Sequence, residues 1–169
     1  MDQKDDHPSF SHLDSRGRAK MVDVGEKEAT RRRAIASGRV RVSRALIDKI
    51  ESNALAKGNL LDVARLAGIQ AGKRTGELIP LCHTLALDHL DVDAWIECGA
   101  IRLRAVASTF ARTGVEMEAL TAVSVAALTV IDMGKAVDPQ MVIEDIRLIE
   151  KTGGRNGDFR ADSGRSARE

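Results

Sequence analysis

The sequence predicts an α+β fold, in which an antiparallel sheet and the helices packed on it form a two-layer sandwich. Strand-like and helix-like segments follow one another along the 169 residues, without the regular strand–helix–strand repeat typical of parallel sheets. Residues 85–96 and 101–108 alternate between apolar and polar side chains and are separated only by a turn at 97–100, which predicts an antiparallel hairpin. An alanine-rich apolar segment, 113–136, predicts a long helix that covers the sheet.

One strand and two helices are expected before the hairpin. Residues 31–42 mix β-branched and charged side chains, as an exposed strand does. Ser43 is a predicted N-cap for a helix that ends near Gly58, and Asn59 is a predicted N-cap for a second helix that ends about Gly76. One side of this second helix is expected to carry Leu60, Val63, Ala64, Ala67 and Gln70.

The long helix follows the hairpin. Thr113 with Glu116 three residues later is a capping-box pattern, which predicts that the helix begins there and ends about Ala136. Its many small side chains allow close packing against a sheet or another helix. A last strand is expected near 146–149, followed by a glycine-rich loop at 152–158.

Composition indicates one globular domain. Hydrophobic residues make up 43% of the chain and aromatic residues only 2%, so the core must consist of Ala, Val, Leu and Ile. Residues 1–20 are polar and mixed in charge and predict a disordered arm. A single catalytic domain is expected over 21–159, and a disordered tail over 160–169.

The charge pattern argues against nucleic acid and membrane partners. The formal net charge is only +1, and the run Arg31–Arg33 follows acidic residues without aromatic stacking partners. Cys82 and Cys98 fit neither a metal-binding spacing nor a secreted disulfide framework. The first twenty residues lack the apolar core of a signal peptide, and no apolar run is expected to span a membrane. These features predict a soluble, cytoplasmic protein without a metal site.

Charged residues within apolar segments are the candidate functional groups. Asp132 and Lys135 share a helix face, where they could exchange protons with a ligand or form an ordinary surface ion pair. Glu116 and Glu118 lie in the first helical turn, where the helix dipole alone favours carboxylates. His83 could transfer protons near neutral pH or be a hydrogen-bonded structural group.

Two segments could bind a phosphate locally. Lys57 precedes the helix capped by Asn59, where an ammonium and free backbone N–H groups could act together. Gly153 and Gly154 could bend the backbone around a phosphate or only change the chain direction.

Several longer motifs stand in a fixed order from Lys57 to Phe159. They are Lys57-Gly58, Ala67-Gly68-Ile69-Gln70-Ala71, Lys73-Arg74-Thr75, Leu78-Ile79-Pro80-Leu81-Cys82-His83, Thr113-Gly114-Val115-Glu116-Met117-Glu118-Ala119-Leu120-Thr121, Asp132-Met133 with Lys135-Ala136, Lys151-Thr152-Gly153-Gly154, and Gly157-Asp158-Phe159. In this order and spacing they closely resemble the cyclic pyranopterin monophosphate synthase family of molybdenum cofactor biosynthesis. The resemblance covers roughly residues 21–159.

The resemblance implies a ferredoxin-like α+β fold and a homo-hexamer, a trimer of dimers, with the active site at a subunit interface. It implies a lyase that needs no cofactor. The expected substrate is a small molecule, the 3′,8-cyclo-7,8-dihydro form of GTP, which is rearranged to cyclic pyranopterin monophosphate with release of pyrophosphate. A non-catalytic nucleotide-binding scaffold of the same fold is the alternative.

The resemblance also assigns site residues. It implies that Asp132 and Lys135 are catalytic, and their opposite protonation states suit a base and an acid for opening and closing rings. It implies that Leu81, Cys82, His83, Met117 and Glu118 bind the substrate and that Lys57, Lys73 and Glu116 lie in the active site. Local cations for a triphosphate could be Lys57, Lys73 and Arg155.

The chain departs from the family pattern at two positions. Asn59 stands where the family often has Asp, and Gly134 stands where Cys is common.

Overall fold

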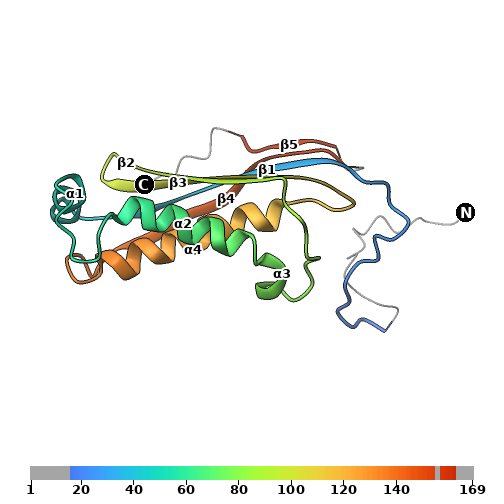
Figure 1. Ribbon diagram of the computed structural model, residues 1–169, viewed down its shortest axis with the longest axis horizontal. Coiled ribbons are helices and arrows are strands. Elements are labelled where there is room, and N and C mark those ends of the chain that lie inside the picture. Colours follow the sequence, from blue (N-terminus) through green and yellow to red (C-terminus); the bar gives the residue numbers. More distant parts are fainter. Residues whose placement is uncertain (1–15, 155–156, 163–169) are drawn as a thin grey trace, which may run out of the picture.

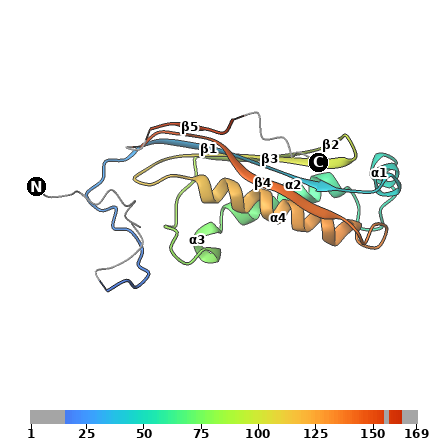
Figure 2. The ribbon, with the colours of Figure 1, turned by 180° about the vertical axis from the view of Figure 1, so that it is seen from behind.

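The fold has two layers, a sheet and a helical layer. The computed structural model describes residues 16–154 and 157–162. Its elements are β1 (Thr30–Arg41), α1 (Arg44–Glu51), α2 (Leu60–Gly72), α3 (Thr75–Leu78), β2 (His89–Glu97), β3 (Ala100–Ala111), α4 (Glu116–Gly134), β4 (Val142–Thr152) and β5 (Phe159–Arg160). Figures 1 and 2 show α2 and α4 on the same face of the sheet. The predicted α+β class, with helices packed on an antiparallel sheet, is confirmed.

The sheet has the strand order β2-β3-β1-β4-β5, and all neighbouring strands are antiparallel. The strand β1 therefore lies in the middle, although it comes first in the chain. Up to β4, the chain alternates as strand, helices, two strands, helix and strand. The more specific ferredoxin-like assignment stays a prediction.

The hairpin of β2 and β3 forms where the sequence predicts it. Cys98 and Gly99 occupy the turn with φ values of 49° and 74°, and two consecutive left-handed residues give a turn whose twist matches that of the strands. The first strand is shorter than expected and begins at His89 instead of residue 85. Before it, the Asp88 N–H donates to the Ser108 carbonyl of β3 at 3.0 Å, and the Thr109 hydroxyl of β3 donates to the carbonyl of Ala86 at 2.6 Å.

Both predicted N-caps are confirmed. The Ser43 side chain accepts from the Leu46 N–H, and the Asn59 side chain accepts from the Asp62 N–H. Each cap satisfies a backbone donor that a helix start leaves without an intrahelical partner.

The predicted ends of these two helices are wrong. The first helix ends at Glu51 instead of Gly58, since the following Ser52 hydroxyl donates to the Asp48 carbonyl at 2.7 Å. The second ends at Gly72 instead of Gly76, because the Thr75 hydroxyl donates to the Gly72 carbonyl at 2.9 Å and a separate short helix begins.

The contact between α2 and α4 depends on glycine. The buried residues of α2 are Leu60, Ala64, Gly68, Ala71 and Gly72. The side expected from the sequence was therefore only partly right, since Val63 and Gln70 are exposed. A Cβ atom on Gly68 would lie 2.8 Å from the Ala122 carbonyl oxygen, and one on Gly72 would lie 3.0 Å from that of Glu118. The two helix backbones therefore lie close together.

The capping box predicted for α4 is wrong. The helix begins at Glu116, its N-cap is the buried Val115, and no side chain caps it. The Glu116 carboxylate pairs with Lys151 at 3.4 Å. Glu116 thus forms an ion pair with a residue distant in the sequence, and it does not join Thr113 in a capping box.

The end of α4 lies at Gly134, close to the predicted end. A Cβ atom there would come within 2.7 Å of Leu46 Cδ2 and 3.0 Å of Met141 Cε. The glycine therefore lets these two side chains pack against the helix end.

By length and composition, α4 could cross a membrane, so the expectation that no apolar run is long enough was wrong for this helix. It is the only such helix in the part of the chain that the structure describes. More than half of its apolar window is buried within the fold, as in the core helix of a globular domain.

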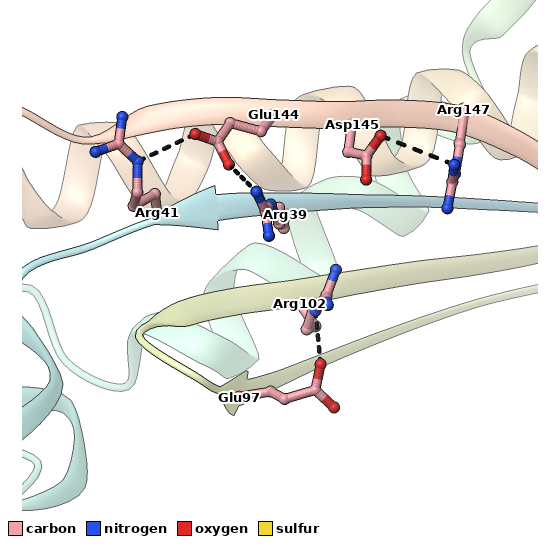
Figure 3. A network of polar contacts seen from close by, with 7 residues as sticks. All are labelled: Arg39, Arg41, Glu97, Arg102, Glu144, Asp145 and Arg147. Atoms are coloured by element: carbon pink, nitrogen blue, oxygen red, sulfur yellow. Dashed lines mark hydrogen bonds and ion pairs between the residues drawn. The ribbon is translucent and has the colours of Figure 1, made fainter. Parts of the chain in front are cut away.

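The sheet face away from the helices carries a charged network, shown in Figure 3. The Glu144 carboxylate pairs with Arg39 at 2.6 Å and with Arg41 at 3.0 Å. On the neighbouring hairpin, Arg102 pairs with Glu97 at 2.7 Å. Alternate residues of β1, such as Val40, point to the opposite side and are buried in the core.

The expected disordered ends lie mostly outside the described residues, which exclude 1–15 and 163–169. Arg160, the first residue of the expected tail, belongs to β5 and pairs with Glu150 of β4. The sheet therefore extends into that segment.

Candidate active site

Lys57, Asp132 and Lys135 form one cluster, here called the Lys–Asp–Lys cluster. The Lys57 ammonium donates to Asp132 Oδ2 at 2.7 Å and to the Asp132 backbone carbonyl at 3.0 Å. The Lys135 ammonium donates to Asp132 Oδ1 at 2.7 Å. Asp132 lies in the last turn of α4, whereas Lys57 comes from the loop before α2. Two lysines therefore hold the two oxygens of one carboxylate at a helix end, where cations are favoured.

The cluster is cationic and partly exposed. Hydrogen bonds from Lys135 and Lys57 lower the pKa of Asp132 from 3.8 to about 2. With this carboxylate ionised and both lysines charged, the cluster carries one net positive charge. A carboxylate with so low a pKa is a weak base near neutral pH. The cluster borders a cavity of about 290 Å³ whose other walls include Leu55, Met133 and Val137.

A larger cavity, here called the first cavity, lies at the opposite end of α4. Its volume is about 480 Å³. The expected substrate-binding residues Leu81, Cys82, His83, Met117 and Glu118 all line it, together with Glu116 and the apolar Val22, Val24 and Leu85. Residues from the segment after α3 and from the first turn of α4 therefore meet at one place.

Burial controls protonation in the first cavity. Burial raises the pKa of Glu118, and the Glu116 carboxylate raises it further against a lowering by the backbone hydrogen bond of Glu118 itself. Burial also raises the pKa of the Cys82 thiol, with a smaller contribution from Glu118. The cavity therefore favours neutral forms of both groups, which can donate hydrogen bonds to a ligand.

A second cavity, here called the basic cavity, adjoins the first. Its volume is about 280 Å³, and its walls include the four cationic side chains of Lys27, Arg32, Arg112 and Lys151. Glu116 is the one carboxylate among its lining residues, so four cations and one anion give a net charge of +3. Lys27, Thr113, Gly114 and Glu116 line both cavities.

The glycine-rich loop forms part of the basic cavity. Gly153 and Gly154 have φ values of 89° and 95°, which only glycine adopts readily. A Cβ atom on Gly154 would overlap the Arg32 guanidinium, so the loop backbone lies directly against this side chain. Arg155, which was expected to contribute a cation, lies outside the described residues.

Sequence reasoning missed most of the cations of the basic cavity. In the sequence Arg32 is only part of the run Arg31–Arg33, and no motif marks Lys27 or Arg112. The signal for Lys151 was present in the Lys151-Thr152-Gly153-Gly154 motif. Lys73, which was expected, is exposed at the carboxyl end of α2 beside Gly72, whose backbone packs on Glu118. It lies near the same end of α4 as the first cavity.

The expected site residues thus form two groups. Glu116 and Asp132 stand in the first and last turns of α4, a helix of 19 residues, so their backbones are about 25 Å apart at 1.5 Å per residue. Figure 1 shows α3 beside one end of α4 and α1 beside the other. A single copy therefore does not bring the Lys–Asp–Lys cluster to the first cavity.

Metal ligation has no candidate among the described residues, because no three side chains of His, Cys, Asp or Glu are grouped to hold an ion.

The fold and the two joined cavities define a class, an α+β protein suited to binding a small anionic molecule. The sequence model of the MoaC family matches residues 21–154, and the chain belongs to this family. The resemblance seen in the motifs is thereby confirmed.

Several curated relatives share about half of their residues with the chain. It is 54% identical over 155 residues to the cyclic pyranopterin monophosphate synthase of Desulforapulum autotrophicum, which covers 90% of this chain and 95% of the relative. The proteins of the same name from Novosphingobium aromaticivorans and Streptomyces griseus are 56% identical over 152 residues and 53% identical over 151 residues. These alignments cover 90% and 89% of this chain and 97% and 85% of the relatives.

Proposed function

We propose that the chain is a cyclic pyranopterin monophosphate synthase, a lyase of molybdenum cofactor biosynthesis. Its small-molecule substrate is the 3′,8-cyclo-7,8-dihydro form of GTP, which it converts to cyclic pyranopterin monophosphate and pyrophosphate. The observation that carries the proposal is an identity above 50% over nine tenths of the chain to synthases of that name. The catalytic domain is the unit 21–159.

The two joined cavities suit the two parts of this substrate. A triphosphate carries several negative charges, and the basic cavity offers four cations to bind it. The ring system fits the first cavity, where the buried Glu118 and the Cys82 thiol can donate hydrogen bonds. His83 borders the same cavity and can accept or supply a proton near neutral pH.

The Lys–Asp–Lys cluster supplies the catalytic groups. We assign proton transfer to Lys135 and Lys57, because the ionised Asp132 is too weak a base near neutral pH and instead orients both ammonium groups. The length of α4 separates this cluster from the substrate-binding cavities of its own chain. The active site is therefore completed by the cluster of a second copy.

The assembly is a homo-hexamer, a trimer of dimers. Such an assembly needs two kinds of interface, and the fold offers two uncovered faces of different character. One is the charged sheet face of Figure 3. The other is the helical layer, where Leu66 of α2 and Leu128 of α4 are 67% and 57% exposed.

The enzyme works in the cytoplasm, where nucleotides are available and a reducing environment suits the free thiols of Cys82 and Cys98.

The test is incubation of the full chain with the cyclised dihydro-GTP substrate, with pyrophosphate and pterin product measured together. Both products are expected in equal amounts, and Lys135→Ala is expected to form neither at a comparable rate. Tight substrate binding without pyrophosphate would instead support the non-catalytic nucleotide-binding scaffold.

A further inference from the structure

The Glu116 carboxylate lies in the basic cavity itself. It pairs with the Lys151 ammonium at 3.4 Å, and the two side chains are only 29% and 30% exposed. Lys151 is one of the four cations that line this cavity. The cation that would bind a phosphate is thus already in contact with an anion from the protein.

Gly114 provides the space for this carboxylate. A Cβ atom at Gly114 would overlap the carboxylate of Glu116, and the three nearest atoms it would meet all belong to that side chain. Gly114 is not among the glycines with positive φ. Glycine at this position therefore leaves room for the Glu116 carboxylate where it lies, and it is not needed for backbone conformation.

We propose that Glu116 is a built-in competitor for phosphate, which a polyphosphate must displace from Lys151 in order to bind. The inference rests on the proposed function, in which the basic cavity receives the triphosphate. Carboxylate and phosphate oxygens accept the same charged hydrogen bonds from an ammonium, so Lys151 cannot serve both fully at once. The competition lowers the affinity for the substrate's phosphates and, equally, for the pyrophosphate product.

Two features favour competition over a purely structural ion pair. The Lys151 ammonium and the Glu116 carboxylate are 3.4 Å apart, longer than a charge-assisted hydrogen bond, so the pair is held loosely. Arg32, Arg112 and Lys27 line the same cavity, so its cations keep a net positive charge that attracts an incoming polyphosphate. The enzyme gains from the competition because a product that binds weakly leaves quickly.

The test measures binding of inorganic pyrophosphate to the full chain by titration calorimetry. Glu116→Gln removes the competing charge and keeps the side-chain size, so the dissociation constant for pyrophosphate should fall about three- to tenfold. Lys151→Met should raise it by about tenfold or more, because it removes the shared cation.

A second variant displaces the carboxylate without removing its charge. Gly114→Ala places a methyl group where the carboxylate lies, and the flexible Glu116 side chain can move aside. Pyrophosphate binding should tighten here also. The control is Glu51→Gln, which removes an exposed carboxylate of α1 that does not line the basic cavity. Its dissociation constant should stay within about twofold of the wild type.

The proposal is overturned if Glu116→Gln binds pyrophosphate no more tightly than the wild type, if Gly114→Ala leaves binding unchanged, or if Glu51→Gln tightens it as much. It is also overturned if neither the wild type nor Glu116→Gln binds pyrophosphate. Activity is a separate result. If the wild type turns over substrate but both variants bind pyrophosphate as the wild type does, only the competition is contradicted. If both variants bind pyrophosphate more tightly but the wild type shows no turnover, only the proposed function is contradicted.

Discussion

Two lysines share the carboxylate of Asp132, and all three side chains are more than half exposed. Exposed ion pairs of this kind contribute little to folding. Their geometry is nevertheless restrictive, since each carboxylate oxygen accepts a separate ammonium. The arrangement therefore suits positioning of the lysines for chemistry more than stabilisation of the fold.

Asp132→Asn should separate these two roles. The amide cannot hold two ammonium groups by charge, so turnover should fall by at least about two orders of magnitude. The melting temperature should change little. Steady-state rates and thermal unfolding measure both effects. Asp48→Asn breaks a comparable exposed pair with Arg44 and should leave turnover unchanged, and normal turnover of Asp132→Asn would contradict the assignment.

The lowered pKa of Asp132 also predicts that part of the folding stability is lost at low pH. Because the folded-state pKa lies near 2 and the ordinary value is 3.8, the folded protein binds this proton less readily than the unfolded chain. The contribution of the ion pairs is therefore present above about pH 4 and is lost as the pH falls toward 2. Any difference in stability between wild type and Asp132→Asn should disappear over that range, as acid unfolding curves can show.

Glu118 should have the opposite pH dependence. Its pKa is raised by burial and by Glu116, so ionisation costs the folded state more than the unfolded chain. This cost is absent below the ordinary pKa of 4.5 and grows as the pH rises through the raised pKa. Glu118→Gln should accordingly melt about 2 to 4 °C above the wild type at pH 8, and the gap should close toward pH 4.

Thermal melts across this pH range test the prediction for Glu118. Glu26→Gln, which changes an exposed carboxylate, should show no such trend. A gap that is constant with pH would mean that ionisation of Glu118 is not its cause.

At the scale of elements, the closeness of α2 and α4 positions the first cavity. The Gly72 backbone packs on the Glu118 carbonyl, and Gly68 packs on that of Ala122. Larger residues at these two places would push apart the helix that carries Glu118 and the helix that ends beside Lys73. The packing of small residues thus fixes the shape of one side of the site.

Gly68→Ala should therefore destabilise the protein by about 1 to 3 kcal/mol. The new methyl group would meet a backbone oxygen at 2.8 Å, and this cost should exceed the gain of about 1 kcal/mol that alanine brings to a helix. Denaturant unfolding measures the difference. Gln70→Ala, on the exposed side of α2, should be neutral or slightly stabilising, and a stabilised Gly68→Ala would show that the helices can separate freely.

What could be predicted from the sequence depended on the distance between interacting residues. Ser43 and Asn59 cap helices through bonds three residues away, and the hairpin needs only its own turn. The start of α4 escaped prediction because Glu116 pairs with Lys151, 35 positions later, instead of joining a local capping box.

The candidate site was predictable where its residues are contiguous or carry a family motif. The residues Leu81, Cys82 and His83 follow one another, and the structure brings them to Met117 and Glu118 as expected. The cations of the basic cavity come from separate segments, with Lys27 before β1 and Arg112 after β3. No local pattern relates them, so only the folded chain reveals their proximity.

For the whole molecule, the decisive feature is that the Lys–Asp–Lys cluster and the two joined cavities lie at opposite ends of α4. Two copies related by a two-fold axis can each give their cluster to the cavity of the other. In the proposed assembly only the oligomer has complete active sites. Sedimentation at micromolar concentration should therefore show an oligomer, and any monomer fraction should be inactive.

Mixed oligomers test this sharing. Asp132→Asn disables one end of α4 and His83→Ala disables the cavity at the other, so each variant alone should be nearly inactive. Co-expressed in equal amounts with different tags, the two chains should regain about a quarter of wild-type activity, because one site in four receives two intact halves by chance. No recovery, despite tags that confirm mixing, would place the complete active site within one chain.

The length of α4 determines the distance between two active sites in the proposed assembly. In a two-fold dimer each copy would contribute its Lys–Asp–Lys cluster to the cavity of the other. The same helix would then reach from one complete site to the other, so the sites would be about 25 Å apart along its axis. Screening in physiological salt acts over only about 8 Å, and the polyphosphate in one site is therefore electrostatically hidden from the other. In the proposed assembly the sites should therefore act independently, and the saturation curve for substrate should be hyperbolic.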